Sequence, residues 1–232
     1  EQNALIRMLL SLNDERTARD LFEVSLRRKG LLLKITSETQ QVVMMSGSPE
    51  LQSITEELTQ TRKKLAGLTL SGPTEENRSD FPRIIYDLEE KINLLQLKLG
   101  EKSQRFRQST KEVTSDEVVE GMGENALVDF MSFRGEDDSL RILAIVVNQG
   151  EFSVVEYEDL ELISSMVMEL REIVQDEGAE DEDVKSVAFE LWEVLWQPLS
   201  EALGETASIF ISPDSLLNVL PFDVLTDEDD SY

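Results

Sequence analysis

The sequence contains no cysteine and no histidine among its 232 residues. Without cysteine, the chain cannot hold a disulfide framework, a thiolate-ligated zinc ion or a cysteine nucleophile. Without histidine, it cannot assemble a Ser–His or Cys–His catalytic pair or a histidine-ligated metal site. The chain also begins at Glu1 rather than at Met, and we expect it to be a piece of a longer protein.

Long hydrophobic runs are also missing. The longest uninterrupted apolar stretches are short, such as residues 142–147 and 31–33. A membrane-spanning helix needs roughly 18–20 apolar residues, and no basic-apolar leader opens the chain. We therefore expect a cytoplasmic protein with no membrane partner.

Basic residues are scarce in the second half of the chain. Residues 1–115 hold 18 Lys+Arg and 17 Asp+Glu, whereas residues 116–232 hold 4 Lys+Arg and 31 Asp+Glu. This asymmetry predicts two regions, a helical region over residues 1–115 and an acidic α/β domain over residues 116–232. The acidic half has the wrong sign to neutralise phosphates, so we expect no nucleic-acid partner.

The first region has the periodicity of long helices. Residues 14–45 form an amphipathic pattern with a single glycine, Gly30, and Ser48 followed by Pro49 is typical of a helix start. Over residues 49–112, two leucine seams joined by one loop predict an antiparallel helical hairpin. The seam residues are Leu51, Ile54, Leu58, Leu65, Leu68, Ile85, Leu88, Ile92, Leu95 and Leu99.

The second region has the pattern of strands between short turns. Residues 126–133, 140–147 and 152–157 predict an antiparallel meander, and residues 207–211 predict a fourth, buried strand of the same sheet. The strands are almost continuously apolar, so helices must cover both faces of the sheet.

Two helices are expected between the third and fourth strands. Their apolar stripes are spaced by three and four residues, Pro198 bends the second helix near its end, and Gly204 closes it. Trp192 and Trp196 lie beside the second stripe. The stripes are Leu160, Ile163, Val167, Leu170 and Val174, and then Val184, Ala188, Leu191, Leu195 and Leu199.

The segment after the fourth expected strand, residues 212–225, reads Ser-Pro-Asp-Ser-Leu-Leu-Asn-Val-Leu-Pro-Phe-Asp-Val-Leu. It resembles the hallmark segment of the CHAT domain, a caspase-like peptidase domain found downstream of TPR repeats. That family shows an apolar strand, then Pro-Asp-Gly, a Leu, and Leu-Pro-Phe. Ser215 stands where the family usually has Gly. The matching residues are Pro213, Asp214, Leu216, Leu220, Pro221, Phe222 and Leu225.

Other segments extend the resemblance in order along the chain. Residues 191–203 are similar to the family helix before that strand, and residues 124–130 are similar to its opening strand. Residues 26–32 and the hairpin after them are similar to the helical region that often precedes the domain. The resemblance implies a mixed sheet with flanking helices, a caspase-like pseudo-half, preceded by an all-α antiparallel helical hairpin region.

The resemblance also implies what the chain does not contain. In the family, the catalytic His and Cys lie after the Leu-Pro-Phe segment, in a second half that this sequence lacks. The chain then corresponds to the non-catalytic scaffold half of a cysteine peptidase. Its implied partners are the downstream catalytic half of the same protein, upstream TPR-like helical repeats, and a protein substrate or regulator. No catalytic residue, metal ligand or cofactor-binding residue is expected here.

An alternative from another class stays open. The helical arm and the acidic α/β domain would form a protein–protein interaction module with no enzymatic activity. In either case, residues 216–222 are too apolar for so acidic a surface and should pack under the sheet. The acidic tail, residues 227–232, should be mobile, because its charges repel and it has little to bury.

Overall fold

The computed structural model describes residues 2–12, 16–29, 48–102, 113–157, 159–176, 180–206 and 208–227. The chain divides into two compact units. An α/β unit comprises Glu1–Leu21 and Val119–Tyr232, and a helical unit comprises Phe22–Val118. The first 21 residues thus belong with the sheet rather than with the helices that follow them. Residues 30–45 of the expected first helix and residues 228–232 of the acidic tail lie outside the described ranges.

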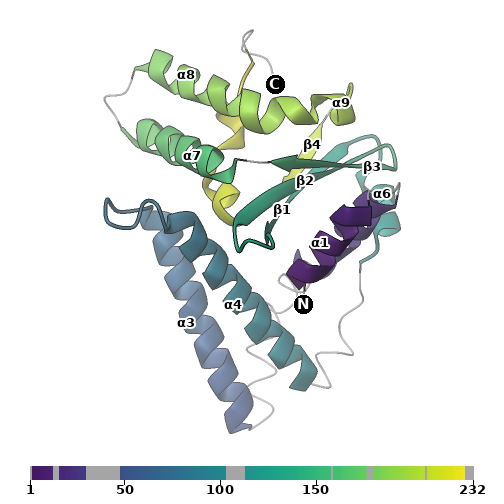
Figure 1. The fold of residues 1–232 in the computed structure, drawn as a ribbon, viewed down its shortest axis with the longest axis vertical. Helices are drawn as coiled ribbons and strands as arrows, with labels where there is room; N and C mark the ends of the chain where they lie inside the picture. Colours follow the sequence, from purple (N-terminus) through teal and green to yellow (C-terminus); the bar gives the residue numbers. More distant parts are fainter. Residues whose placement is uncertain are drawn as a thin grey trace. The chain divides into compact units, whose positions relative to one another are not determined.

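A four-stranded mixed sheet forms the centre of the α/β unit (Figure 1). Its strands are β1 (Ala126–Arg134), β2 (Leu140–Asn148), β3 (Glu151–Tyr157) and β4 (Ile209–Ser212), in the order β3-β2-β1-β4. The first three strands form the expected antiparallel meander, with Phe130 opposite Ala144. β4 returns to pair parallel with β1, placing Val128 opposite Ile211. The prediction of a mixed α/β layer structure is confirmed.

The central and edge strands differ in burial. β1 and β2 are each buried over six consecutive positions. Burial of this kind requires cover on both faces of the sheet. The expectation that the fourth strand is buried is wrong, because β4 lies at the edge and Phe210 is 52% exposed. Its apolar sequence matches that of a central strand, but among the described strands it pairs with β1 alone.

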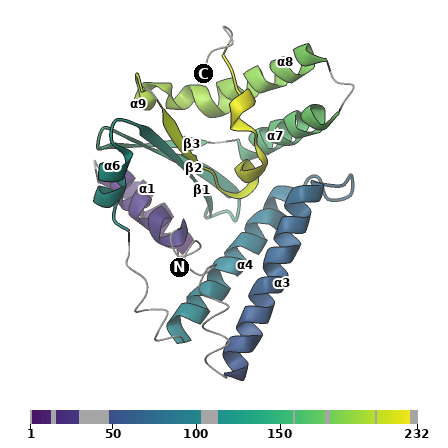
Figure 2. The same cartoon turned by 180° about the vertical axis from the view of Figure 1, so that it is seen from behind.

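Helices cover the two faces from different parts of the sequence. On one face lie α7 (Leu160–Gln175) and α8 (Asp181–Leu191), and on the other lies α1 (Gln2–Leu12) (Figures 1 and 2). The expected stripes of α7 and α8 are buried except at their ends, where Val174 is exposed and Leu160 and Val184 are half-buried. The α9 turn (Ser200–Leu203) ends at Gly204, whose N–H donates to the Ser200 carbonyl and whose φ is 53°.

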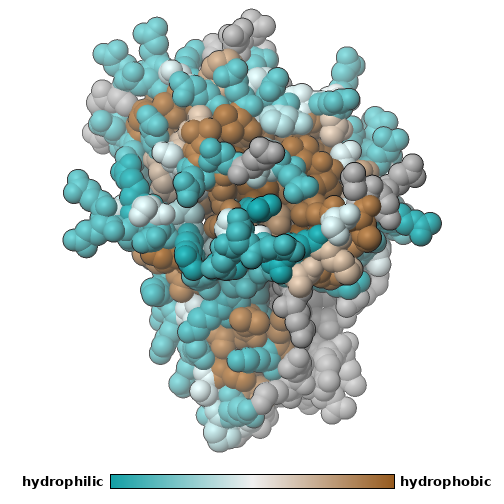
Figure 3. Space-filling view, viewed as in Figure 1, coloured by the Kyte–Doolittle hydropathy of each residue, from teal (hydrophilic) through white to brown (hydrophobic). Residues whose placement is uncertain are grey.

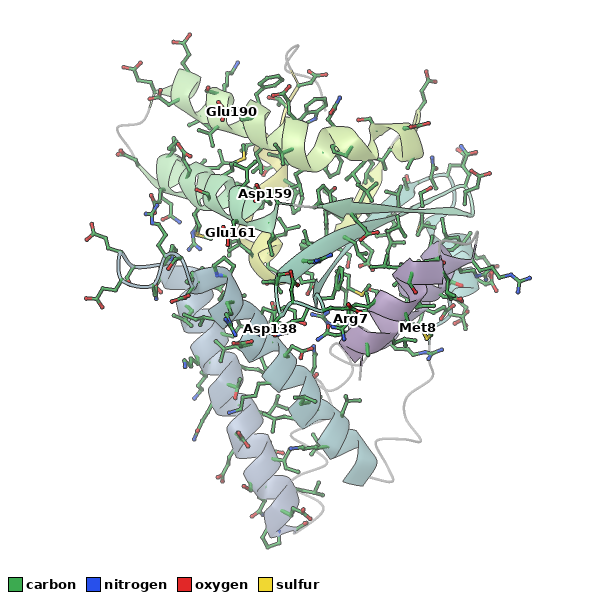
Figure 4. The ribbon with its side chains drawn as sticks, in the orientation of Figure 1. Arg7, Met8, Asp138, Asp159, Glu161 and Glu190 are labelled. Atoms are coloured by element: carbon green, nitrogen blue, oxygen red, sulfur yellow. The ribbon has the colours of Figure 1, made fainter. Side chains whose placement is uncertain are left out.

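α1 is fastened to the turn between β1 and β2. Arg7 Nη1 donates to the carbonyls of Arg134 and Gly135 at 2.8 and 3.2 Å, and the Asn3 side chain accepts from the Arg134 N–H. Figure 4 shows Arg7 and Asp138, which lies in that turn. At Gly135, a Cβ would lie 2.6 Å from the Asp137 carboxylate and 2.9 Å from the Ser139 hydroxyl, so these side chains would have to shift to admit a larger residue. These contacts place an N-terminal helix on a sheet that begins more than a hundred residues later.

The helical unit contains two long helices, α3 (Pro49–Ser71) and α4 (Phe81–Lys102). Ser48 caps α3 by accepting from the Leu51 N–H, and Gly72, with φ 72°, ends it. Seven of the ten expected seam residues meet in one apolar cluster, in which Ile54 and Leu65 are partly buried. Its buried members are Leu51, Leu58, Ile92, Leu95 and Leu99. Two further helical segments each contain a boundary between the two units. They are residues 17–29 and α6 (Ser115–Met122).

Within the described ranges, no helix is long and apolar enough to cross a membrane.

Candidate functional site

The motif segment begins with a sharp turn where β4 ends. After Pro213, Asp214 is extended, and Ser215 then adopts a left-handed conformation with φ 50°. L-amino acids other than Asn and Asp rarely occupy this region, whereas glycine does so freely. Ser215 is also buried, so the turn places a strained residue in the interior. The position that holds Gly in the resembling family therefore has glycine-like geometry here.

Asp214 fastens this turn to the centre of the sheet. Its buried carboxylate accepts a 2.7 Å hydrogen bond from the backbone N–H of Ser132 in β1. Ser132 lies three residues beyond Asp129, which is opposite the last residue of β4. The carboxylate thus extends the pairing of β1 beyond the end of β4, with a charge-assisted bond in a buried place. This arrangement makes Asp214 a structural group rather than one presented to a substrate.

The apolar residues of the motif pack into the interior. Two short 3-10 helices, Ser215–Val219 and Phe222–Val224, turn the chain back under the helical layer that contains α7. Leu216, Leu217, Leu220 and Leu225 are all buried. The expectation that residues 216–222 pack under the sheet holds in part: Leu216, Leu217 and Leu220 are buried and the first 3-10 helix contacts α7, whereas Pro221 and Phe222 are half-buried.

Phe222 joins the motif to the core through its ring. The ring stacks on Phe130 of β1, with ring centroids 5.9 Å apart. It also makes an edge-to-face contact with Trp196, with ring centroids 6.3 Å apart. Phe130 also lies 6.4 Å from Tyr157, whose hydroxyl donates to the Leu195 carbonyl at 2.6 Å. Burial raises the pKa of Tyr157 far above its ordinary value, so this phenol stays protonated. A series of contacting aromatic rings therefore links β1, β3, the helical turn Trp192–Trp196 that follows α8, and the C-terminal segment.

A half-open hollow of about 580 Å³ lies at the other end of the sheet, near the first residues of β1. The exposed carboxylates of Glu124 and Glu205 flank it. In the parts of the chain that the structure describes, no group of three or more acidic side chains is arranged to hold a metal. The residues that line the hollow are Val119, Met122, Gly123, Glu124, Gln149, Gly150, Glu205 and Thr206.

The structure thus brings Pro213, Asp214, Leu216, Leu220, Pro221 and Phe222 into one turn and its packing surface. Ser215 Oγ is buried without a hydrogen-bond partner, so it is neither exposed nor activated as a nucleophile. What these residues accomplish is to hold the C-terminal segment in one place on the sheet.

Sequence reasoning missed the residues that receive the motif. The sequence pattern places Ser132 and Phe130 only in a strand. It places Trp196 only beside the apolar stripe of a helix. Their spacing from the motif ranges from 26 to 92 residues, and no local pattern marks such partners. Only the parallel return of β4 beside β1 brings them together.

Comparisons of the chain with protein-family models, with curated proteins and with solved structures find no match.

Proposed function

We propose that this chain is the non-catalytic scaffold half of a CHAT-type, caspase-like cysteine peptidase. It would support a downstream catalytic half that supplies the His–Cys dyad. The helix pair α3–α4, as an antiparallel hairpin, would be the helical region before the domain, with TPR-like repeats upstream. A protein would be the substrate or regulator.

The observation that carries this proposal is the backbone of Ser215. The resembling family has glycine at the position that Ser215 occupies. A chance resemblance in sequence would not require a left-handed residue at that position. Ser215 has a φ of 50°, a conformation that glycine adopts without steric cost. The Asp214 bond to Ser132 gives the adjacent motif residue an equally specific role.

The test is to extend the chain with the residues that its gene encodes after Tyr232. The extended protein should contain a Cys and a His, and should hydrolyse a panel of fluorogenic peptides in the presence of thiol. Replacing that Cys with Ala should abolish turnover while leaving the melting curve unchanged. The 232-residue chain alone should hydrolyse nothing. Turnover by that chain that survives repurification, or an extension without Cys or His, would overturn the proposal.

A second candidate is an acidic interaction module with no enzymatic activity. The charge of the α/β unit favours it, because that unit has 7 Lys+Arg against 33 Asp+Glu. A surface of one sign attracts partners of the other and repels copies of itself. An extended protein that binds a basic partner but never acquires peptidase activity would favour this candidate over the first.

A further inference from the structure

A row of aromatic side chains lies along the outer shoulder of α8 and its continuation. Phe189 and Trp192 stack with centroids 6.3 Å apart, and Trp196 follows four residues later against the edge of Phe222. All four side chains are half-buried rather than enclosed. We call Phe189, Trp192, Trp196 and Phe222 the aromatic ledge. In the region of α7 and α8, Figure 3 shows hydrophobic surface interrupted by hydrophilic residues.

An irregular helical turn shapes this ledge. The α-helix of α8 gives way to a π-helical turn over Trp192–Trp196, in which the Gln197 N–H bonds to the Trp192 carbonyl. Pro198 then imposes a short 3-10 turn, since it has no N–H to continue the α-helical ladder. Turns of this kind are uncommon and recur at functional sites. Here the turn places both tryptophans on the shoulder, while Leu191 and Leu195 point into the core.

Acidic residues stand close to the ledge. Exposed Glu193 lies one turn before Trp196, whereas Glu190, shown on α8 in Figure 4, is two residues from Trp192 and so lies on another side of the helix. Exposed Asp223 follows Phe222 directly. Lys185, one turn before Phe189, is the only basic residue of α8. Flat aromatic faces beside carboxylates are complementary to a planar cation.

We propose that the aromatic ledge binds an arginine-bearing segment of a partner protein. Guanidinium groups would stack on the indoles of Trp192 and Trp196 and pair with Glu193 and Asp223. Arginine suits this surface better than lysine, because its planar and weakly hydrated head stacks on aromatic rings and meets carboxylates with two donors. A second copy of the chain is disfavoured by repulsion between units that each carry a net charge of -26. The inference does not depend on the peptidase proposal.

The chain offers a direct readout of this binding. Its only two tryptophans are Trp192 and Trp196, so tryptophan fluorescence, excited at a wavelength where tyrosine does not absorb, reports on the ledge. The probe is a peptide of about twelve residues with arginine at every third or fourth position among alanines, in buffer at physiological ionic strength. Its lysine analogue is the matched comparison. Binding should shift the tryptophan emission and reduce quenching by acrylamide, with the arginine peptide binding several-fold more tightly.

Two double variants separate the ledge from general attraction to an acidic protein. Glu193→Gln with Asp223→Asn should weaken arginine-peptide binding by about fivefold or more, the equivalent of about 1 kcal/mol. Glu161→Gln with Glu169→Gln removes the same charge from exposed positions on α7, where Figure 4 shows Glu161. This control should change the affinity less than about twofold, because salt screens distant charges. Unchanged melting curves would establish that both variants fold.

Trp192→Phe tests the stacking itself. It keeps an aromatic ring and leaves Trp196 as reporter, and it should weaken arginine-peptide binding without lowering the melting temperature. Equal weakening by the ledge and α7 charge variants, equal affinity for the two peptides, or an unchanged emission would each overturn the proposal. So would dimerisation of the chain through this surface in sedimentation experiments without peptide.

Discussion

The two units of this protein contrast in how their interiors are assembled. In the helical unit, the apolar cluster joins residues of two helices that follow one another across a single connection, residues 72–80. In the α/β unit, the core joins Phe130 to Phe222 and Val128 to Ile211, across more than eighty residues. The first interior depends on a repeated local spacing, the second on a long-range return of the chain.

Charge separates the units as clearly as topology does. The helical unit has 15 Lys+Arg and 15 Asp+Glu, whereas the α/β unit has 7 and 33, so the whole net charge of -26 belongs to the second. Self-repulsion therefore opposes folding of one unit only. The contrast teaches that an acidic surface need not be matched by an acidic interior, since the α/β core is apolar and aromatic.

The largest test of this contrast is Phe130→Ala. Phe130 is fully buried and contacts two other rings, so its loss should cost about 3–5 kcal/mol of unfolding free energy. Urea unfolding followed by tryptophan fluorescence isolates the α/β unit, which holds both tryptophans. We predict that this transition shifts strongly while the far-ultraviolet circular dichroism retains a second, unshifted helical component. A single joint transition would contradict the independence of the units.

Leu58→Ala makes the opposite change. Leu58 is buried in the cluster between α3 and α4, and its truncation should cost about 2–5 kcal/mol. The circular dichroism transition of the helical unit should shift, while tryptophan fluorescence should not. Leu70→Ala on the same helix is the control, because Leu70 is 81% exposed and should change stability by no more than about 0.5 kcal/mol. Equal effects at the two leucines would show that the seam is not the core.

Asp214→Ala removes the side chain that joins the motif turn to β1. The Ser132 N–H would then be buried without its acceptor, at a cost of about 1–3 kcal/mol to the α/β unit. Asp214→Asn keeps an acceptor oxygen and should cost less. Both are measured by the fluorescence-detected urea transition, and an alanine variant as stable as the parent would refute the role of this bond.

Ser215→Gly should stabilise the α/β unit by about 1 kcal/mol, since it relieves a left-handed serine. The gain is limited by the added freedom of glycine in the unfolded chain. Ser186→Gly, at an exposed position within α8, is the matched control and should lower stability. If both variants destabilise, the backbone at Ser215 is not left-handed.

The smallest effect concerns an exposed ion pair of the helical unit. Lys91 Nζ lies 2.8 Å from Glu57 Oε1, and its hydrogen bond and charge lower the pKa of Glu57. A lowered carboxyl pKa contributes stability above the ordinary pKa and loses it as the pH falls through the folded-state pKa.

Lys91→Met should therefore raise the pKa of Glu57 towards its ordinary value in an NMR titration of the carboxyl carbon. Lys98→Met, which removes a weaker influence, should raise it less. Equal changes in the two variants would mean that no direct pair exists in solution.

The sequence by itself determined several elements that depend on local pattern, although it did not predict α1 or α6. The apolar period placed the seams of α3 and α4 and the buried stripes of α7 and α8, and β-branched runs between turn residues placed β1, β2 and β3. Ser48 and Gly204 could be assigned to helix ends, because capping needs only a neighbouring backbone. The burial of Leu216, Leu217 and Leu220 was also expected from the apolar sequence.

Tertiary structure alone decided what lies beside what. α1 covers one face of the sheet through Arg7 and Asn3, and nothing in its apolar sequence specified that destination. β4 has the composition of a central strand yet lies at an edge, since composition does not say how many neighbours a strand has. The Asp214 bond to Ser132 and the stacking of Phe222 on Phe130 arise when a parallel strand returns to β1. Such contacts depend on the path of the whole chain, whereas helix seams and caps depend on residues a few positions apart.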